Sequence, residues 1–421
     1  MRHPIARIGL ALLLAGTTAV SFARPPSAAS AAPTRWATSW IAPAQPLWDS
    51  GFALPLGMPQ PLQDMTVRQH LRVSVGGERL RLVVSNEYGR SPLRVASAHV
   101  AVDASRAVGA GAYASFQGSK EITVAAGAKA LSDPIPVAVP SGARLRVDLY
   151  LPDRTPLAGF HWDARDQTLL LPGNVAGRAA AEGGEKLATR AFLSAVLVES
   201  ARAPVAVVAL GDSITDGNGS TPGADHRWPD FLARRLAPRG IAVLNAGISG
   251  NRLLTPGMGE SALARLERDV LQHPGVRAVV VLLGTNDIGW PGAAFAPNEA
   301  LPPLSSLTDG LRQLIEQARV RGVRVIGGTL MPFEGALEGT PLEGHYSPEK
   351  EALRQQLNEW IRHAGAFDAV VDFDRLARDP SRPTRLRAAF DSGDHLHPGD
   401  EGYRAMADSI DLRALLGPAH E

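Results

Sequence analysis

The sequence predicts two regions of different fold class, an antiparallel β-rich region over residues 34–200 and an α/β region over residues 203–417. In the first region, short stretches that alternate apolar and polar residues are separated by Gly and Pro. That pattern is typical of a β-sandwich or a jelly roll. In the second region, apolar strand-like runs alternate with stretches of helical periodicity. That alternation predicts a doubly wound, parallel sheet covered by helices.

Within the β-rich region, the clearest local pattern is a pair of alternating stretches over residues 66–75 and 78–84. Gly76 and Gly77 separate them, and a Gly-Gly pair between two such stretches is a hairpin signal. The sequence therefore predicts a β-hairpin here. Further strands are predicted over residues 93–100, 120–124, 135–139 and 145–151.

Within the α/β region, five apolar runs predict the strands of the sheet, and helical periods predict the connections between them. Leucines at helical spacing predict a helix over residues 304–318, and Ser347 followed by Pro348 predicts the start of another. A last helix is predicted around Tyr403. The five strands are predicted over residues 205–210, 241–244, 276–283, 323–326 and 369–371.

The first 31 residues have the pattern of an export signal. Arg2 and Arg7 precede an apolar run over residues 8–20, and the small residues 29–31 offer a cleavage site. The apolar run is too short to span a bilayer, which takes about 20 residues. We therefore expect cleavage, a secreted or periplasmic protein, and no stable membrane insertion.

Charge and composition exclude several classes of function. Removing residues 1–31 removes three arginines and no acidic residue, so the formal net charge falls from +1 to −2. A near-neutral protein has no electrostatic basis for binding nucleic acid. The chain contains no cysteine, which excludes disulfides and thiolate metal sites. No nucleotide P-loop motif and no zinc-protease motif is present, and the scattered histidines give no clear metal cluster, so the motifs predict neither a nucleotide P-loop nor a metal centre.

The most informative motif is GDSITDG over residues 211–217, directly after the predicted strand 205–210. Open α/β sheets bind ligands at the carboxyl ends of their strands, so Ser213 is placed to present its hydroxyl to a cleft. We predict that Ser213 is a nucleophile, and the alternative is that it caps a helix. Asp212 and Asp216 are interpreted as turn and cap residues that could also fix the serine loop.

An acid–base pair is predicted near the C-terminus, where Asp394 precedes His397 by three residues and Pro398 follows. At that spacing the carboxylate can hold one ring nitrogen while the other faces a serine. His395 is the competing histidine, but its offset of one residue from Asp394 disfavours that pairing.

Two more segments complete a recognisable set, NAGISGN over residues 245–251 and GTND over residues 284–287. Together with the serine and histidine motifs they resemble the SGNH hydrolases, the GDSL-type esterase superfamily. The resemblance implies a flavodoxin-like, three-layer α/β/α domain that hydrolyses esters without metal or cofactor. It also implies that the amides of Ser213 and Gly250 and the side chain of Asn286 form the oxyanion hole, with Gly247 left open as an alternative to Gly250. Asp287 is expected to cap the turn that follows.

The β-rich region resembles, much more weakly, the β-sandwich that precedes this domain in some secreted bacterial esterases. Trp36, Trp40 and Trp162 form either a sugar-stacking surface or part of the core. The leading hypothesis is a secreted esterase that removes short acyl groups, such as O-acetyl groups on carbohydrate. A lipase or arylesterase is the alternative within the same class. A glycan-binding protein with an inactive hydrolase scaffold is the alternative of another class.

Overall fold

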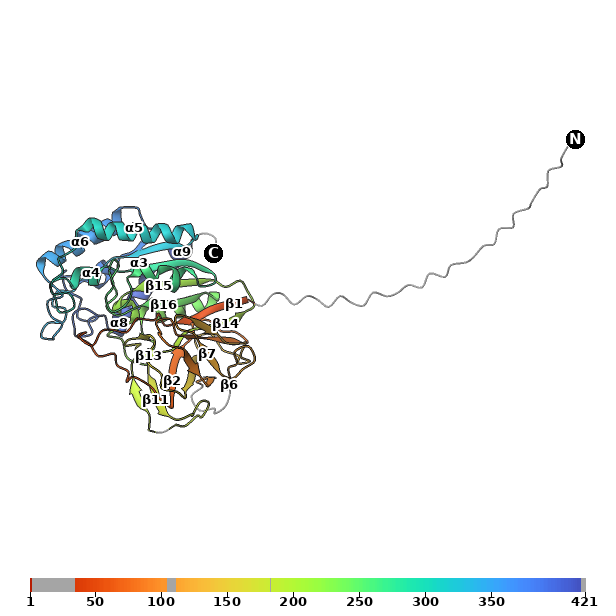
Figure 1. Cartoon of the computed structure of the whole chain (residues 1–421). Coiled ribbons are helices and arrows are strands. Elements are labelled where there is room, and N and C mark those ends of the chain that lie inside the picture. Colours follow the sequence, from red (N-terminus) through yellow and green to blue (C-terminus); the bar gives the residue numbers. More distant parts are fainter. Residues whose placement is uncertain (2–34, 104–110, 182, 418–421) are drawn as a thin grey trace. The chain divides into compact units, whose positions relative to one another are not determined.

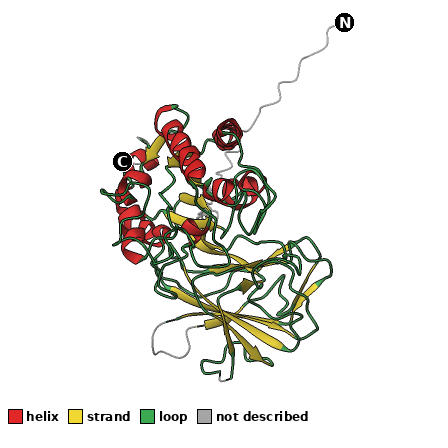
Figure 2. Ribbon diagram, turned by 90° about the vertical axis from the view of Figure 1, so that its left-hand side faces the viewer, coloured by secondary structure: helices red, strands yellow, loops and turns green. Residues whose placement is uncertain are grey.

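The computed structural model describes residues 1, 35–103, 111–181 and 183–417. The predicted signal peptide, apart from Met1, lies outside the described residues. Residues Thr34–Glu421 form one compact unit. Figure 2 shows strands gathered in one part of this unit and helices in the other.

The β-rich region contains two main antiparallel sheets, as predicted. A four-stranded sheet has the order β1-β14-β3-β8, and a six-stranded sheet has the order β12-β11-β2-β9-β5-β6. Pairs β4-β7 and β10-β13 stand apart from them. The strands of this region are β1 Arg35–Ile41, β2 Met65–Arg72, β3 Leu80–Ser85, β4 Leu93–Val95, β5 Ser97–Val102, β6 Gly111–Tyr113, β7 Ile122–Val124, β8 Lys129–Leu131, β9 Arg144–Leu151, β10 Phe160–His161, β11 Thr168–Pro172, β12 Glu185–Leu187, β13 Arg190–Ala191 and β14 Leu193–Ser200.

The predicted hairpin around Gly76 and Gly77 is wrong. Strand β2 pairs with β9 and β11, whereas β3 pairs with β14 and β8, so the two strands lie in different sheets. The glycines allow other backbone segments to approach closely: a Cβ on Gly76 would lie 2.2 Å from the carbonyl oxygen of Val139, and one on Gly77 would lie 2.3 Å from that of Glu199. The sequence signal therefore marked a crossing between sheets.

Two other strand predictions need correction. The stretch 93–100 is divided between β4 and β5, which pair with different partners. Residues 135–139 form isolated bridges, from Ile135 to Leu80 and from Val139 to Gly77. The side chains of Ile135 and Val139 are both buried. The alternation of apolar residues therefore indicated buried side chains, but the prediction of a strand was wrong.

The α/β region contains one parallel sheet of five strands in the order β16-β15-β17-β18-β19. Each of the five predicted strands is confirmed. Gly211 at the end of β15 pairs in register with Gly247 of β16 and Leu282 of β17. The carboxyl ends of these three strands therefore meet at one edge. The strands are β15 Ala206–Gly211, β16 Ala242–Gly247, β17 Val276–Leu282, β18 Arg324–Gly328 and β19 Ala369–Val371.

Helices connect the strands of the parallel sheet. Helix α2 packs on β16 and against α8. Helix α5 packs on β18 and against α6, beside which it lies in Figure 1. Ser347 caps α6 with Pro348 at its first position, as predicted. None of the helices in the described part of the chain is long and apolar enough to cross a membrane. The helices are α1 Ser213–Asp216, α2 Trp228–Leu236, η1 Ala237–Arg239, α3 Ala262–Leu266, η2 Glu267–Leu271, α4 Thr285–Gly289, α5 Leu304–Val320, α6 Pro348–His363, α7 Phe373–Ala377, α8 Asp400–Ser409 and α9 Leu412–Leu416.

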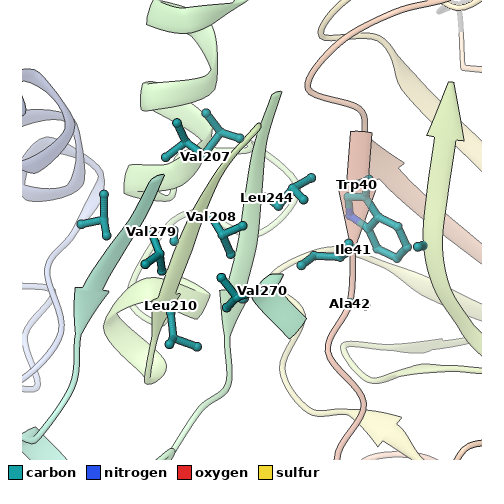
Figure 3. Packing of buried hydrophobic residues seen from close by; sticks show 14 of the residues in the cluster. Trp40, Ile41, Ala42, Val207, Val208, Leu210, Leu244, Val270 and Val279 are labelled. Atoms are coloured by element: carbon teal, nitrogen blue, oxygen red, sulfur yellow. The ribbon is translucent and has the colours of Figure 1, made fainter. Parts of the chain in front are cut away.

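The β-rich region packs on the edge strand β16 of the parallel sheet. Figure 3 shows Ile41 and Ala42, at the end of β1, beside Leu244 of β16. The hydroxyl of Ser74 accepts a 2.8 Å hydrogen bond from the amide of Val243 on that strand. The contact covers an edge that would otherwise expose unpaired backbone groups.

Candidate active site

Ser213 is the first residue of the short helix α1, directly after β15. The helix cap is Asp212, whose side chain accepts a 3.0 Å hydrogen bond from the amide of Ile214. Gly217, with φ of 111°, ends the helix in the left-handed region. The cap role that was the alternative for Ser213 therefore belongs to Asp212, and the hydroxyl of Ser213 is available for other contacts.

The hydroxyl of Ser213 contacts the ring of His397, with 2.8 Å between Oγ and Nε2. The other ring nitrogen, Nδ1, lies 2.6 Å from Oδ2 of Asp394. A neutral imidazole that donates from Nδ1 to the carboxylate accepts at Nε2, so the serine hydroxyl donates to His397. Ser213, His397 and Asp394 thus form one hydrogen-bonded line across 184 residues of sequence.

The carboxylate of Asp394 is fixed by more than the histidine ring. Its Oδ1 accepts from the amides of Leu396 at 2.9 Å and His397 at 2.8 Å. Burial alone would raise the pKa of Asp394, but these hydrogen bonds and the one from the His397 ring lower it well below its usual value. The group is therefore ionised at neutral pH.

His395 points to a different carboxylate. Its Nδ1 contacts Oδ2 of Asp391, and its backbone has a φ of 60°. Asp394 is left to His397, as the spacing predicted.

Gly250 lies in a tight turn after β16, with φ of 67°. A Cβ here would lie 2.4 Å from the sulfur of Met258 and 2.8 Å from the ring of Trp290, so only glycine fits. Within the described part of the chain, its amide donates to no acceptor. Gly247 differs, because its amide donates to Oδ1 of Asn245 at 2.9 Å. The amide of Gly250 is therefore free to bind an external oxygen, whereas that of Gly247 is occupied.

Asn286 lies in the first turn of α4, just beyond β17, and is 4 % exposed. Its Nδ2 donates to the backbone oxygen of Asn251 at 3.0 Å, which leaves the second hydrogen of the amide unused and sets the side chain beside the Gly250 turn. Asp287 does not act as the predicted cap. Its two oxygens accept from the amides of Leu253 and Leu254, at 2.8 and 3.1 Å, and so hold the chain that follows Asn251.

A buried arginine ties the strand ends together beneath these residues. Arg265 of α3 is 0 % exposed and donates to the carbonyl oxygens of Gly211 and Ala246 at 3.0 and 2.7 Å. It also donates to the side chain of Asn251 at 3.0 and 2.8 Å, and to Asp269 at 3.1 Å. One guanidinium therefore spans the nucleophile strand, the neighbouring strand and the turn that carries Gly250.

Asp212 is an unusual carboxylic acid. It is 0 % exposed, and its Oδ2 has no hydrogen-bond partner in the described part of the chain. Burial raises the pKa of Asp212 to about 7, against the lowering effect of the hydrogen bond from Ile214 and the charge of His397. A neutral acid next to the nucleophile avoids a second buried negative charge there.

The β-rich region contributes residues that the sequence did not single out. His161 of β10 lies 2.9 Å from Oδ1 of Asp216, in the nucleophile motif. Arg165 contacts the carbonyl oxygen of Ser220. Burial raises the pKa of Asp163, and so does the charge of Asp216, whereas the charges of Arg165 and His397 lower it. Each of the two contacts, His161 with Asp216 and Arg165 with Ser220, joins residues 55 positions apart, so no local sequence pattern could predict it.

Aromatic rings from both regions pack in a row that ends at Gly250: Trp290 is buried and lies against this glycine, whereas Trp48, Phe52, Trp162 and Phe295 are partly exposed. The rings of Trp48 and Phe52 are 4.5 Å apart, Phe52 and Phe295 are 5.5 Å apart, and Phe295 and Trp290 are 4.5 Å apart. The ring of Trp162 lies 5.9 Å from that of Trp48. The indole of Trp48 donates to the carbonyl oxygen of Met258 at 2.7 Å. We refer to Trp48, Phe52, Trp162, Trp290 and Phe295 as the aromatic cluster.

The three tryptophans considered from the sequence do not form one surface. The guanidinium of Arg81 lies over the ring of Trp36, and that of Arg190 over the ring of Trp40, which is 8 % exposed. Only Trp162 belongs to the aromatic cluster.

A cavity of about 360 Å³ lies behind the nucleophile loop, between the β-rich region and helix α2. Trp40, Arg190, Asp216 and Arg227 are among its lining residues, but Ser213 is not. The described residues contain no group of three or more His, Asp or Glu side chains arranged to hold a metal ion.

Comparison with known proteins identifies the domain that carries the Ser213–His397–Asp394 line. Residues 209–405 match the model of the GDSL-like Lipase/Acylhydrolase family. This part of the chain is similar to the domain of that family, and the protein is a hydrolase that acts on ester bonds.

Solved structures similar to the chain cover about half of it. A GDSL-like lipase from Bacteroides thetaiotaomicron is 21 % identical over 51 % of this chain and 91 % of its own, with a TM-score of 0.37. A carbohydrate acetylesterase family member from Sinorhizobium meliloti is 18 % identical over 51 % and 100 %, with a TM-score of 0.40. An acetyl xylan esterase is 20 % identical over 49 % and 97 %, with a TM-score of 0.36. No curated protein matches the chain.

Proposed function

We propose that the protein is a serine esterase that hydrolyses short-chain acyl esters, with O-acetyl groups on carbohydrate as its substrates. The observation that carries the proposal is the hydrogen-bonded line from Ser213 through His397 to Asp394, at the edge where three parallel strands end. A serine, a histidine and a carboxylate in this order form the nucleophile, base and orienting acid of acyl transfer.

In the proposed mechanism, Oγ of Ser213 attacks the ester carbonyl carbon while Nε2 of His397 takes the hydroxyl proton. The tetrahedral intermediate collapses to an acyl-serine, and His397 returns the proton to the leaving alcohol. Water then attacks the acyl-serine, with His397 again acting as base, and the carboxylic acid and free Ser213 result. Asp394 holds Nδ1 of the ring and stabilises the imidazolium that forms twice in each cycle.

The negative oxygen of each intermediate needs aimed donors. We assign this role to the amides of Ser213 and Gly250 and to Nδ2 of Asn286. Support comes from the free first-turn amide of α1, the unused amide of Gly250 and the unused amide hydrogen of Asn286. The occupied amide of Gly247 argues for Gly250 in the position that the sequence left open.

The aromatic cluster supports a carbohydrate substrate. Four of its rings are partly exposed, and the fifth, that of the buried Trp290, lies against Gly250 in the proposed oxyanion hole. The apolar face of a sugar ring packs against such a surface while its hydroxyls stay in contact with water and polar groups.

The same cluster favours one second candidate, an arylesterase, because aromatic rings also bind an aromatic leaving group. The two candidates differ in the leaving alcohol and share the nucleophile, so substrate comparison separates them.

The test compares acetate release from acetylated xylan with hydrolysis of p-nitrophenyl esters of increasing chain length and of phenyl acetate. Ser213→Ala is the active-site variant, and Ser305→Ala, at an exposed serine on α5, is the matched control. We expect Ser213-dependent acetate release from the glycan and synthetic activity confined to short chains.

Other outcomes have defined meanings. Phenyl acetate cleavage with an inert glycan would replace the carbohydrate substrate by an aryl ester, and rates that rise with chain length would indicate a lipase. Glycan binding without any Ser213-dependent hydrolysis would indicate a binding protein on a hydrolase scaffold.

We also propose export, with cleavage near residue 31, on the basis of the sequence of residues 1–31. Mass spectrometry of the protein's N-terminus, recovered from outside the cytoplasm, tests this directly. A protein that starts at Met1 would contradict it.

A further inference from the structure

One side chain of the β-rich region reaches the loop that carries the nucleophile. His161 ends β10 and is 6 % exposed. Its Nδ1 lies 2.9 Å from the carbonyl oxygen of Pro43, and its Nε2 lies 2.9 Å from Oδ1 of Asp216. The ring is therefore held between the β-rich region and the motif that contains Ser213.

Both ring nitrogens of His161 face oxygen atoms, and this fixes where the protons are. A carbonyl oxygen only accepts, so Nδ1 carries a hydrogen that it donates to Pro43. With a neutral ring and an ionised Asp216, the lone pair of Nε2 would then face Oδ1 of the carboxylate. A proton must therefore lie between Nε2 and Oδ1, and it joins the two side chains by a hydrogen bond.

Asp216 also contacts the turn that carries Gly250. Its second oxygen, Oδ2, accepts from the amide of Ser249 at 3.1 Å and from the hydroxyl of Ser249 at 2.9 Å. Ser249 directly precedes Gly250. On its other side, the amide of Asp216 donates to the carbonyl oxygen of Asp212, within the nucleophile turn.

The fit between the two loops leaves little freedom. A Cβ on Gly247 would lie 2.2 Å from the amide nitrogen of Asp216, so the chain of the second motif passes directly against the nucleophile helix. The carboxylate of Asp216 can hold Ser249 in this position only while its own orientation is fixed. His161 supplies that constraint, because Oδ1 has no other donor among the described residues.

We propose that His161 is a positioning residue for ester hydrolysis, and that the β-rich region thereby forms part of the oxyanion hole's support. The hydrogen bond from His161 orients Asp216, and Asp216 holds Ser249 so that the amide of Gly250 points at the developing oxyanion. The inference rests on the proposed esterase function. It gives the β-rich region a role in the chemical step, apart from any role in binding substrate.

Two substitutions of His161 separate its two hydrogen bonds. The amide nitrogen of a glutamine reaches the place of Nε2, so His161→Gln keeps a donor toward Asp216 and loses the one toward Pro43. The amide nitrogen of an asparagine reaches only the place of Nδ1, so His161→Asn keeps a donor toward Pro43 and loses the one toward Asp216. The pair differs by one methylene group and is matched in polarity.

The measurement is kcat and KM of the full chain on p-nitrophenyl acetate, with the thermal midpoint of each variant. We expect His161→Asn to lower kcat by about 10- to 100-fold, less than the loss of a whole oxyanion donor, which costs about 100- to 1000-fold. KM should change by less than about threefold, because the contact acts in the transition state. His161→Gln should keep kcat within about threefold of the wild type at a similar loss of thermal midpoint.

Equal kcat values for the two variants would overturn the proposal, whether both match the wild type or both fall together with thermal stability. Asp216→Asn probes the same bond from the other partner and leaves the β-rich region intact. We expect a similar fall in kcat, and no further fall when it is combined with His161→Asn. An unchanged kcat in Asp216→Asn would contradict the proposal even where His161→Asn does not fold.

Ser213→Ala distinguishes this proposal from the one on which it rests. Hydrolysis that survives Ser213→Ala would contradict the esterase mechanism itself. Hydrolysis that depends on Ser213 but not on the bond between His161 and Asp216 would contradict only the role of His161.

Discussion

Both regions of the protein bury charged side chains, but they bury them in different places. In the β-rich region, Arg68 on β2 and Asp148 on β9 pair in the middle of the six-stranded sheet, with side chains 4 % and 0 % exposed. In the α/β region, the buried Arg265 lies under the ends of β15 and β16, directly below the nucleophile turn.

The difference shows what each buried charge organises. Arg68 donates to both oxygens of Asp148, at 2.7 and 3.0 Å, and to the carbonyl oxygen of Arg178, so it fixes a surface loop on its own sheet. Arg265 fixes the turn of Asn251, which touches Asn286. The buried Arg68 therefore serves the local fold of its own region, whereas the buried Arg265 serves the site.

His161 is the exception to this division, because it belongs to the β-rich region and bonds to the nucleophile motif. Four experiments test the comparison, beginning with the largest expected effect.

Asp394→Asn tests whether the buried polar groups at the strand ends carry the chemistry. The amide cannot hold His397 with its proton on Nδ1, so we expect kcat to fall by about 1,000- to 10,000-fold. The measurement is steady-state hydrolysis of p-nitrophenyl acetate. Asp391→Asn is the matched control, since Asp391 holds His395, and it should keep kcat within about threefold. Equal losses would show that the two aspartate–histidine pairs are not distinct in function.

Arg265→Met and Arg68→Met test the comparison most directly. Each replaces a buried arginine by an apolar side chain and leaves the paired aspartate without its guanidinium partner. We expect each to lower the free energy of unfolding by about 3 to 5 kcal/mol. Only Arg265→Met should also lower kcat of the folded fraction, because it frees the Asn251 turn. Urea unfolding gives the stability and the folded fraction of each variant, and kcat is then compared per folded molecule. An equal kcat in both variants would remove the distinction between the regions.

Asp212→Asn tests the neutral acid beside the nucleophile. Because the pKa of Asp212 is raised to about 7 in the folded protein, ionisation favours the unfolded state as pH rises from about 4 to 7. The free energy of unfolding of the wild type should therefore fall across this window, relative to Asp212→Asn, by up to about 4 kcal/mol. Urea unfolding at several pH values measures the difference, with Asp49→Asn at an exposed site as control. Parallel curves for the wild type and Asp212→Asn would show that Asp212 ionises normally.

Arg94→Ala should have the smallest effect. Arg94 pairs with Glu121 at 3.0 Å and Asp153 at 3.4 Å, but all three side chains are more than 40 % exposed. Solvent and salt screen such pairs, so we expect no measurable change in the urea midpoint or in kcat. A clear loss of stability would mean that surface charge in the β-rich region matters as much as buried charge.

The five strands of the parallel sheet and the start of helix α6 could be predicted because they depend on local patterns. Continuous apolar runs such as residues 276–283 read as buried strands, and Ser347 with Pro348 marks a helix start. The β-rich region was less predictable. The Gly76–Gly77 pair looked like a hairpin, but which strands pair depends on distant partners such as β9 and β14, and no local pattern contains that information.

The sequence by itself pointed to Ser213, Asn286, Asp394 and His397, because each lies in a short motif whose residue types match one chemical task, but it left Gly247 and Gly250 as alternatives. Only the tertiary structure decided how those motifs are held. The bond from His161 to Asp216, the span of Arg265 across two strand ends and the raised pKa of Asp212 arise where distant segments pack together and exclude water. Chain connectivity fixes which groups are available, whereas burial fixes their partners and their charge.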